Sequence, residues 1–134
     1  MFSKKYLSRL LALVLVLVMG LIGCGSNPSG LTGNYSQDTL AVLQNLSTAI
    51  NLSNDAPDKK EVVTLARQQI SDYASRYRRD AKTAGLRSFT TMQTALNALA
   101  GYYSSYGIRP LPDKLKQRLQ QEFKQVEISL KRGV

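Results

Sequence analysis

Residues 88–106 read SFTTMQTALNALAGYYSSY, and this stretch carries the clearest fold signal in the chain. Its large apolar side chains recur every three or four residues, at Phe89, Met92, Leu96, Leu99, Tyr103 and Tyr106. That spacing places them on one face of an α-helix and predicts that this face packs into a core.

Three other segments repeat the pattern. Their apolar stripes are Leu40, Leu43, Leu46 and Ile50; Val63, Ala66, Ile70, Tyr73 and Tyr77; and Leu115, Leu119, Phe123, Val126 and Leu130. No stretch after Cys24 alternates as a strand would. Short connections between successive helices favour antiparallel neighbours. We therefore predict an all-α fold, an up-down-up-down antiparallel four-helix bundle over residues 35–134.

Residue types that begin or end helices flank these stripes. The expected starts are Asn34 or Ser36, Pro57 in a first turn after Asp55, Ser88 as an N-cap, and Pro112 as a first helical residue. The expected ends are residues 51–56, Gly85, Gly107 and Gly133. Leu111 is expected to pack back onto the first turn around Leu115, as a hydrophobic staple.

The amino terminus has the organisation of a bacterial lipoprotein signal. Lys4, Lys5 and Arg9 precede an apolar run that ends in Leu21-Ile22-Gly23-Cys24, the pattern of a lipobox. The run of about 13 residues is too short for a membrane-spanning helix, which needs about 20. We predict a cleaved signal peptide at residues 1–23, lipid attachment at Cys24, and a flexible tether over residues 24–34, rich in Gly, Ser, Asn and Pro.

Composition argues against catalysis and metal binding. Removal of residues 1–23 from the 134-residue chain leaves 111 residues, and the net charge falls from +9 to +6 because the signal holds three cations and no acid. The chain has no histidine, and Cys24 is its single cysteine, so no disulfide is expected. Glu122 and Glu127 fall on different helix faces. We expect no catalytic residues, no cofactor and no metal. Nucleic acid is not an expected partner, since no recognition motif is present.

Two clusters stand out from a generic bundle. Arg76, Arg78, Arg79 and Asp80 lie together near Lys82 and Arg87. They are either a solvated helix end that complements the helix dipole or a docking patch for acidic groups. Tyr102 falls off the apolar stripe and lies near Arg109, which suits a protein interface. Tyr103 and Tyr106 belong to the stripe and are expected to pack in the core.

The sequence also resembles a known family along nearly all of the exported part. The resemblance is carried by residues 31–35 (LTGNY) with Asp38-Thr39, by residues 75–80 (SRYRRD), and by residues 88–103, continuing through Tyr106 and residues 109–112 (RPLP) to Lys114, Leu115 and Arg118. With the lipobox, these segments are similar to the small photosystem II assembly and repair lipoproteins of the lumenal side of cyanobacterial thylakoids.

The resemblance implies a four-helix, non-catalytic assembly factor that is anchored to the thylakoid membrane by its lipid. Such factors bind photosystem II intermediates on the large lumenal loop of an inner chlorophyll-binding antenna subunit. They act in biogenesis and repair, before the manganese cluster forms and the extrinsic subunits dock. We expect a monomer. The alternative from another class is a structural lipoprotein that associates with an anionic membrane surface through its basic face.

Overall fold

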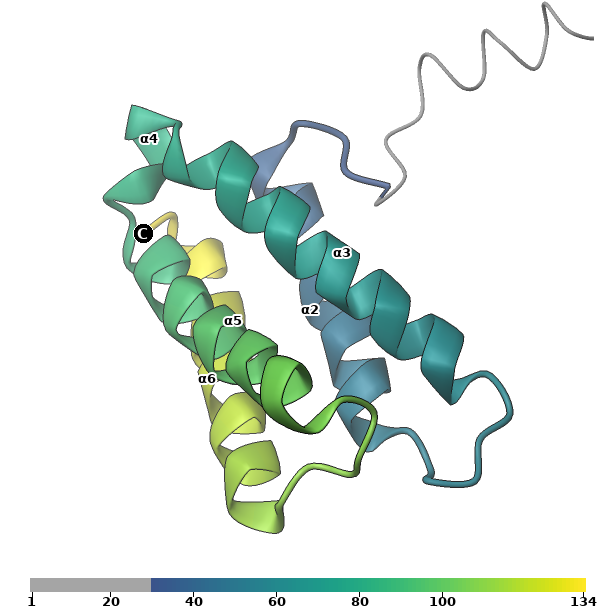
Figure 1. Ribbon diagram of the computed structural model, residues 1–134. Helices are drawn as coiled ribbons and strands as arrows, with labels where there is room; N and C mark the ends of the chain where they lie inside the picture. Colours follow the sequence, from purple (N-terminus) through teal and green to yellow (C-terminus); the bar gives the residue numbers. More distant parts are fainter. Residues whose placement is uncertain (1–29) are drawn as a thin grey trace, which may run out of the picture. The chain divides into compact units, whose positions relative to one another are not determined.

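The computed structural model describes residues 30–134; the predicted signal peptide, Cys24 and residues 24–29 of the predicted tether lie outside the described residues. All regular secondary structure within residues 30–134 is helical. The helices are α2 (Tyr35–Asn51), α3 (Lys59–Arg78), α4 (Ala81–Ala84), α5 (Arg87–Tyr106) and α6 (Asp113–Arg132) (Figure 1). The prediction of an all-α fold is confirmed.

The four long helices run alternately up and down (Figure 1). Helix α3 packs against α2 and α5, while α6 packs against α5 and α2, so the bundle closes as a ring in chain order. The loops of residues 52–58 and 107–112 lie at one end, which we call the loop end. Residues 31–34, α4 and the carboxyl terminus lie at the other, which we call the tether end.

Apolar side chains from all four long helices meet in one core. The stripe of α5 is buried as predicted from Phe89 to Tyr103, with no residue of it more than 5% exposed. Large side chains that are less than 2% exposed come from every long helix, and they are Val42, Leu46, Tyr73, Met92, Leu96, Leu99, Leu119 and Val126. Burial of this apolar surface is the main favourable contribution to folding of such a bundle.

Two residues of the predicted stripes are exposed instead. Leu40 is 45% exposed, because the buried arc of α2 is centred on Thr39, Val42 and Leu46 and Leu40 lies outside it. Tyr106 is 54% exposed although its helical position is on the stripe. It is the last residue of α5, so the bundle ends beside it and no neighbouring helix covers it.

Several predicted helix ends are shifted. The second helix was expected to reach Gly85, but α3 ends at Arg78 and Asp80 begins α4 by accepting a hydrogen bond from the Lys82 backbone N–H at 3.0 Å. Helix α3 starts at Lys59, so Pro57 is in the preceding loop. Pro112 likewise precedes α6 as its N-cap rather than starting it.

Other helix ends behave as expected. Asn34 caps α2, its side chain accepting from the Gln37 backbone N–H at 3.0 Å. Gly107 and Gly133 end α5 and α6 with φ of 65° and 72°, a left-handed region that glycine adopts at no steric cost. Leu111 and Leu115 are both partly buried against the core, beside the first turn of α6.

Candidate functional site

The most densely bonded group in the described chain is the carboxylate of Asp38, which is 1% exposed in the first turn of α2. It accepts hydrogen bonds from the backbone N–H of Thr32 at 2.7 Å, the Thr32 hydroxyl at 2.8 Å and the backbone N–H of Gly33 at 3.0 Å. The hydroxyl of Tyr77 donates a fourth bond from α3. Asp38 therefore ties the segment before α2 to the bundle.

The carboxylate of Asp38 is stabilised in its charged form despite its burial. Burial alone would raise the pKa of this carboxyl, but the hydrogen bonds from Tyr77, Thr32 and Gly33 outweigh it and hold the pKa below its ordinary value of 3.8. Sequence reasoning did not single out Asp38 as a structural residue. The available signal was its position one helical turn before Val42, which puts an acid on the apolar face of α2.

Residues 31–34 are therefore part of the folded unit, although the tether was expected to extend over residues 24–34. Leu31 is 8% exposed within the core cluster, and Gly30 is exposed. The reason is that the predicted tether contains one large apolar side chain, Leu31, followed by two residues whose N–H groups reach Asp38.

Hydroxyl and aromatic groups beside Asp38 join three helices. The Thr39 hydroxyl lies 2.7 Å from that of Tyr73, and the Tyr35 hydroxyl lies 2.6 Å from Ser88 Oγ. The rings of Tyr35 and Tyr77 pack edge to face with their centroids 5.2 Å apart. Ser88 is thus a buried partner of Tyr35, while Leu86 occupies the N-cap position of α5 that was expected for Ser88.

The Arg76 cluster, which we define as Arg76, Arg78, Arg79 and Asp80, lies at the tether end where α3 meets α4. Arg76 is half-exposed, and its guanidinium is 3.8 Å from Asp38 Oδ2. Arg78 and Arg79 are exposed, and within residues 30–134 neither forms an ion pair. Asp80 is engaged in capping α4. Two arginine side chains are therefore free to meet an acidic surface.

The Tyr102 cluster, which we define as Tyr102, Tyr106, Ile108 and Arg109, lies at the loop end. The Tyr102 hydroxyl donates to the Pro110 carbonyl at 2.6 Å, and its ring lies 5.0 Å from that of Tyr106. Tyr106 and Ile108 are 54% and 47% exposed, and Arg109 is exposed. Exposed aromatic, aliphatic and arginine side chains side by side have the composition of a protein interface.

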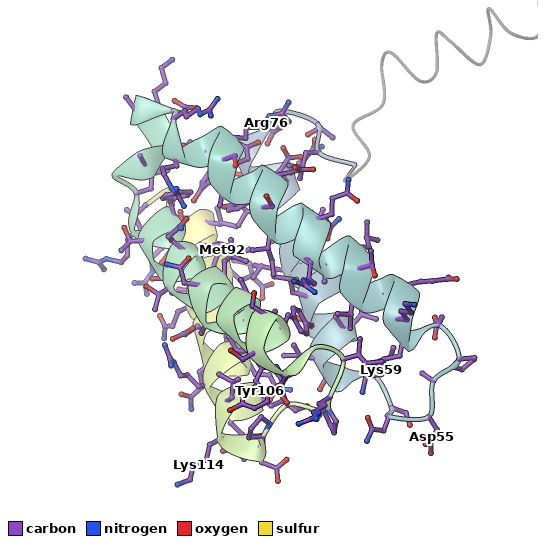
Figure 2. The ribbon with its side chains drawn as sticks, viewed as in Figure 1. Asp55, Lys59, Arg76, Met92, Tyr106 and Lys114 are labelled. Atoms are coloured by element: carbon purple, nitrogen blue, oxygen red, sulfur yellow. The ribbon has the colours of Figure 1, made fainter. Side chains whose placement is uncertain are left out.

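The two clusters do not form one patch. Figure 2 shows Arg76 near the tether end of the bundle and Tyr106 near the loop end. Along α5, which runs between the ends, Tyr102 follows Arg87 by 15 positions, which correspond to about 22 Å at 1.5 Å per residue. The residues predicted together as a docking surface therefore belong to two surfaces.

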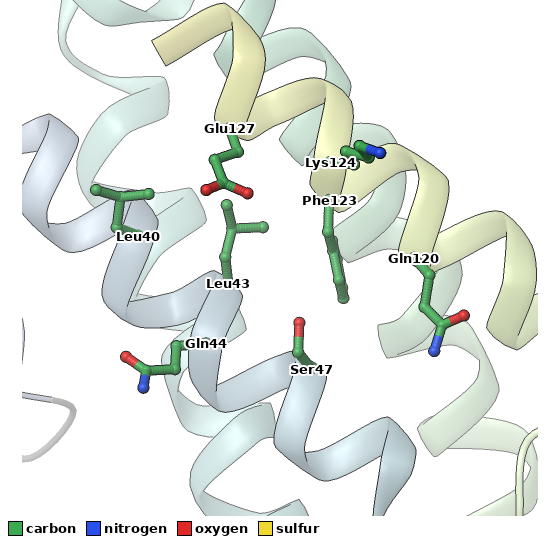
Figure 3. Close-up of a pocket in the computed structure, with 8 residues that line it drawn as sticks. All are labelled: Leu40, Leu43, Gln44, Ser47, Gln120, Phe123, Lys124 and Glu127. Atoms are coloured by element: carbon green, nitrogen blue, oxygen red, sulfur yellow. The ribbon is translucent and has the colours of Figure 1, made fainter. Parts of the chain in front are cut away.

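Two of the cavities in the described part of the chain are a groove between α2 and α6 and a smaller cavity at the loop end. The groove, of about 510 Å³, lies where Leu40, Leu43 and Phe123 meet polar side chains that include Lys124 and Glu127 (Figure 3). The smaller cavity, of about 170 Å³, is lined by Lys59, Tyr103 and Arg109, among others. Neither lining contains a histidine or cysteine.

Within residues 30–134 no group of three or more His, Cys, Asp or Glu side chains is arranged to hold a metal ion. In the same part of the chain, no helix combines the length and the apolar character needed to cross a bilayer. Three of the described acids have local structural partners: Asp38 accepts several hydrogen bonds, Asp80 caps α4, and Glu122 pairs with Arg118 at 3.0 Å.

Comparison with known proteins identifies the family. The sequence profile of the family described as Photosystem II Pbs27 matches residues 4–130, nearly the whole chain. This chain belongs to that family. The resemblance seen in the sequence is therefore confirmed, and the Pbs27 match spans the predicted lipobox, helices α2 to α5 and α6 as far as Leu130.

Two cyanobacterial relatives match over nearly their full length, and a plant relative matches over part of its length. The chain is 63% identical over 133 residues to the photosystem II lipoprotein Psb27 of Synechocystis sp., covering 99% of this chain and 98% of that protein. It is 50% identical to the photosystem II assembly factor lipoprotein Psb27 of Thermosynechococcus vestitus, with 96% of each chain covered. The photosystem II repair protein PSB27-H1 of Arabidopsis thaliana is 31% identical over 74% of this chain and 58% of its own.

Solved structures of the Pbs27 family share the helical fold. The solution structure of Psb27 from cyanobacterial photosystem II superposes with a TM-score of 0.76 at 64% identity, covering 83% of this chain and 96% of that one. The crystal structure of PSB27 from Arabidopsis thaliana gives a TM-score of 0.72 at 31% identity over 75% of this chain and 98% of that one. The helical bundle is therefore common to cyanobacterial and plant members.

Proposed function

We propose that this chain is a photosystem II assembly and repair factor without catalytic activity. In this proposal a lipid on Cys24 holds the protein at the lumenal side of the thylakoid membrane. The protein binds assembly intermediates transiently, at the large lumenal loop of an inner antenna subunit, before the manganese cluster forms and the extrinsic subunits dock. The observation that carries the proposal is the near full-length similarity to two cyanobacterial Psb27 lipoproteins, one of them named as a photosystem II assembly factor, together with the partial similarity to a plant photosystem II repair protein.

The physical properties of the chain support a transient binding role. A lipid anchor confines a protein to a surface and raises its effective concentration near membrane-embedded partners. A bundle with a well-packed core presents a preformed surface, so binding requires little additional ordering. The described surface offers exposed Tyr, Arg and Ile side chains rather than a nucleophile paired with a base.

Two surfaces are proposed to make the contacts. The Tyr102 cluster supplies a partly apolar interface in which Tyr102 also holds the loop before α6 in place through Pro110. The Arg76 cluster supplies an electrostatic contact with an acidic surface, mainly through Arg78 and Arg79, because Arg76 is already close to Asp38 and Asp80 caps α4. A rigid body with contact residues at both ends can bridge a lumenal loop and a second acidic surface.

The direct test is a pull-down of the tagged chain from detergent-solubilised thylakoids, followed by mass spectrometry. We expect recovery of photosystem II monomers that lack manganese and extrinsic subunits. Tyr106→Ala with Arg109→Glu should reduce recovery, whereas Leu65→Ala, an exposed residue on α3 away from both clusters, should not. Recovery of lipid without photosystem II subunits would contradict the proposal and favour the structural lipoprotein.

The anchor has its own test. Metabolic labelling with a radioactive fatty acid should mark the wild-type protein, and Cys24→Ser should abolish the label because the chain has no other cysteine. The variant should also shift from the membrane fraction toward the soluble fraction. A labelled Cys24→Ser protein would rule out lipid attachment at Cys24.

A further inference from the structure

The point at which the chain enters the bundle is fixed on one end of the molecule. Leu31 is buried in the core, and the N–H groups of Thr32 and Gly33 are hydrogen-bonded to Asp38. Asp38 is bonded in turn to Tyr77 near the carboxyl end of α3. A lipid on Cys24 therefore connects to the bundle at the tether end and not along its side.

The length of the connection limits how the bundle can lie on a membrane. Cys24 precedes Leu31 by seven residues, which span at most about 25 Å when fully extended. The 20-residue helices α5 and α6 are each about 30 Å long. The connection is thus too short for the loop end to rest on the bilayer while the tether end points away. The remaining orientations are side-on, or end-on with the tether end toward the lipid.

Charge distinguishes the two ends. The exposed cations of the tether end are Arg76, Arg78, Arg79, Lys82, Arg87, Lys131 and Arg132. The exposed acids nearby are fewer, with Asp80 capping α4 and Glu127 at 4.0 Å from Lys131. At the loop end, exposed acids and bases are nearly balanced, with Asp55, Asp58, Glu61 and Asp113 against Lys60, Arg109 and Lys114.

We propose that the tether end is a membrane-docking surface for anionic lipid headgroups. Arg78, Arg79, Lys82 and Arg87 contact the headgroups, and the bundle stands end-on with the Tyr102 cluster pointing away from the bilayer. The inference rests on the lipid anchor of the proposed function. The anionic headgroups are then the acidic surface that the Arg76 cluster contacts.

Proximity favours lipid as the partner of this surface. An attached lipid keeps the tether end within about 25 Å of the headgroups at all times, as the tether length requires. Attraction between the exposed cations and an anionic surface acts within a Debye length, about 8 Å at physiological ionic strength. Basic side chains close to an anionic bilayer each strengthen binding. The same orientation presents Tyr106 and Ile108 to partners that protrude from the membrane.

The orientation can be measured because the chain has one cysteine and no tryptophan. The chain beginning at Cys24 is coupled through that thiol to a maleimide lipid in vesicles that also contain a dansyl-headgroup lipid. A single tryptophan is introduced at the exposed residue Ala81 of the tether end, or at the exposed residue Tyr106 of the loop end. Energy transfer from the introduced tryptophan to dansyl is then measured for Ala81→Trp and for Tyr106→Trp. The efficiency of transfer reports how close each end of the bundle lies to the membrane surface.

On phosphatidylglycerol vesicles we expect much stronger transfer from residue 81 than from residue 106. The difference should shrink on neutral phosphatidylcholine and at high salt, where side-on orientations are no longer disfavoured. Equal energy transfer from both positions on anionic vesicles would overturn the inference. A difference in transfer that does not depend on lipid charge or salt would overturn it as well.

Charge reversal provides the matched control. Arg78→Glu with Arg79→Glu should remove the dependence on lipid charge. Lys60→Glu with Lys114→Glu makes the same change in net charge on exposed residues of the loop end and should leave that dependence intact. Without the covalent coupling, the tether-end pair should weaken vesicle binding about tenfold or more, and the loop-end pair should not. Circular dichroism confirms that each variant is folded.

The outcomes separate this inference from the proposed function. The coupling is chemical, so the vesicle result does not depend on binding to photosystem II. If Arg78→Glu with Arg79→Glu leaves the vesicle signals unchanged but prevents recovery of photosystem II in detergent, the surface binds an acidic protein and the inference is wrong. Orientation on anionic vesicles without any recovery of photosystem II would support the inference and contradict the proposed function.

Discussion

The hydroxyl of Tyr77 donates a hydrogen bond of 2.5 Å to Oδ2 of Asp38, linking α3 to the first turn of α2 across 39 residues of sequence. The acceptor is a buried carboxylate that also holds the backbone of Thr32 and Gly33. This single contact therefore connects the packing of two helices to the place where the chain enters the bundle.

Removal of the Tyr77 hydroxyl should be costly. In Tyr77→Phe the ring stays in place but a buried carboxylate loses a donor, and we expect the free energy of unfolding to fall by about 1.5–3 kcal/mol. Tyr102→Phe is the control, because its hydroxyl bonds a carbonyl at an exposed site and its loss should cost about 1 kcal/mol or less. Urea unfolding measures both, and equal losses would contradict a special role for the Asp38 contact.

Asp38 should make stability sensitive to acid. Its pKa is lower in the folded chain than its ordinary value of 3.8, so the unfolded state binds the proton more tightly and acidification favours unfolding. The stabilisation is present above the unfolded-state pKa and is lost as the pH falls through the folded-state pKa. Asp38→Asn should be less stable than wild type at pH 7, and the difference should narrow below about pH 4. Unfolding curves between pH 3 and 7 test this, and a constant difference would refute it.

Tyr103 and Tyr73 should respond in opposite directions to loss of their hydroxyls. Within residues 30–134 the buried Tyr103 hydroxyl has no hydrogen-bond partner, whereas that of Tyr73 bonds Thr39. Tyr103→Phe should therefore be neutral or stabilising by up to about 1 kcal/mol, and Tyr73→Phe destabilising by about 1 kcal/mol. Thermal unfolding at neutral pH gives both values, and a marked loss in Tyr103→Phe would reveal a missed partner.

Tyr103 also gives a prediction at alkaline pH. Burial, with a smaller effect of Tyr102, raises the pKa of Tyr103 to about 12. The folded state favours the neutral hydroxyl, so its contribution is complete below the unfolded-state pKa of about 10 and is lost as the pH rises toward 12. Tyr103→Phe should flatten the decline in stability over this range. Unfolding measured from pH 8 to 12 checks it, and an unchanged decline would assign the effect to other groups.

Two leucines of α2 differ in burial, and truncating them should therefore differ in its effect on stability. Leu46 is fully buried, and Leu46→Ala should cost about 2–5 kcal/mol through lost burial and a residual cavity. Leu40 is 45% exposed at the groove between α2 and α6, so Leu40→Ala should change stability by about 0.5 kcal/mol or less. Comparable losses at the two positions would mean that Leu40 is covered in solution, by a partner or a second copy.

The spacing of apolar residues along the chain was sufficient to predict the helices and most of the core. The residues from Phe89 to Tyr103 recur at helical intervals, and a stripe of that length can bury itself only against other helices. The predictions of burial failed where packing against a neighbouring helix, rather than the helical spacing, decides how exposed a side chain is. Tyr106 continues the stripe of α5 but lies past the last residue that another helix covers.

Each candidate surface was predictable from the sequence, but their positions relative to each other on the bundle were not. Arginine and tyrosine clusters are visible in the sequence, and the structure places the two at opposite ends of the bundle. The break between Arg78 and Ala81 was missed because the side chain of Asp80 replaces the backbone bonding of a continuous helix. Whether either cluster binds a partner stays a prediction.

The sequence by itself determined the helical class, the segments that form helices and the family, because helical periodicity and family motifs are local properties of the chain. Only the tertiary structure decided that Asp38 is a buried junction between the segment before α2 and α3, with the guanidinium of Arg76 beside it. Besides the short-range bond from Thr32 to Asp38, this junction depends on the contact between Asp38 and Tyr77, which lie 39 residues apart in the sequence. Such contacts exist only once the core has brought α2 and α3 together.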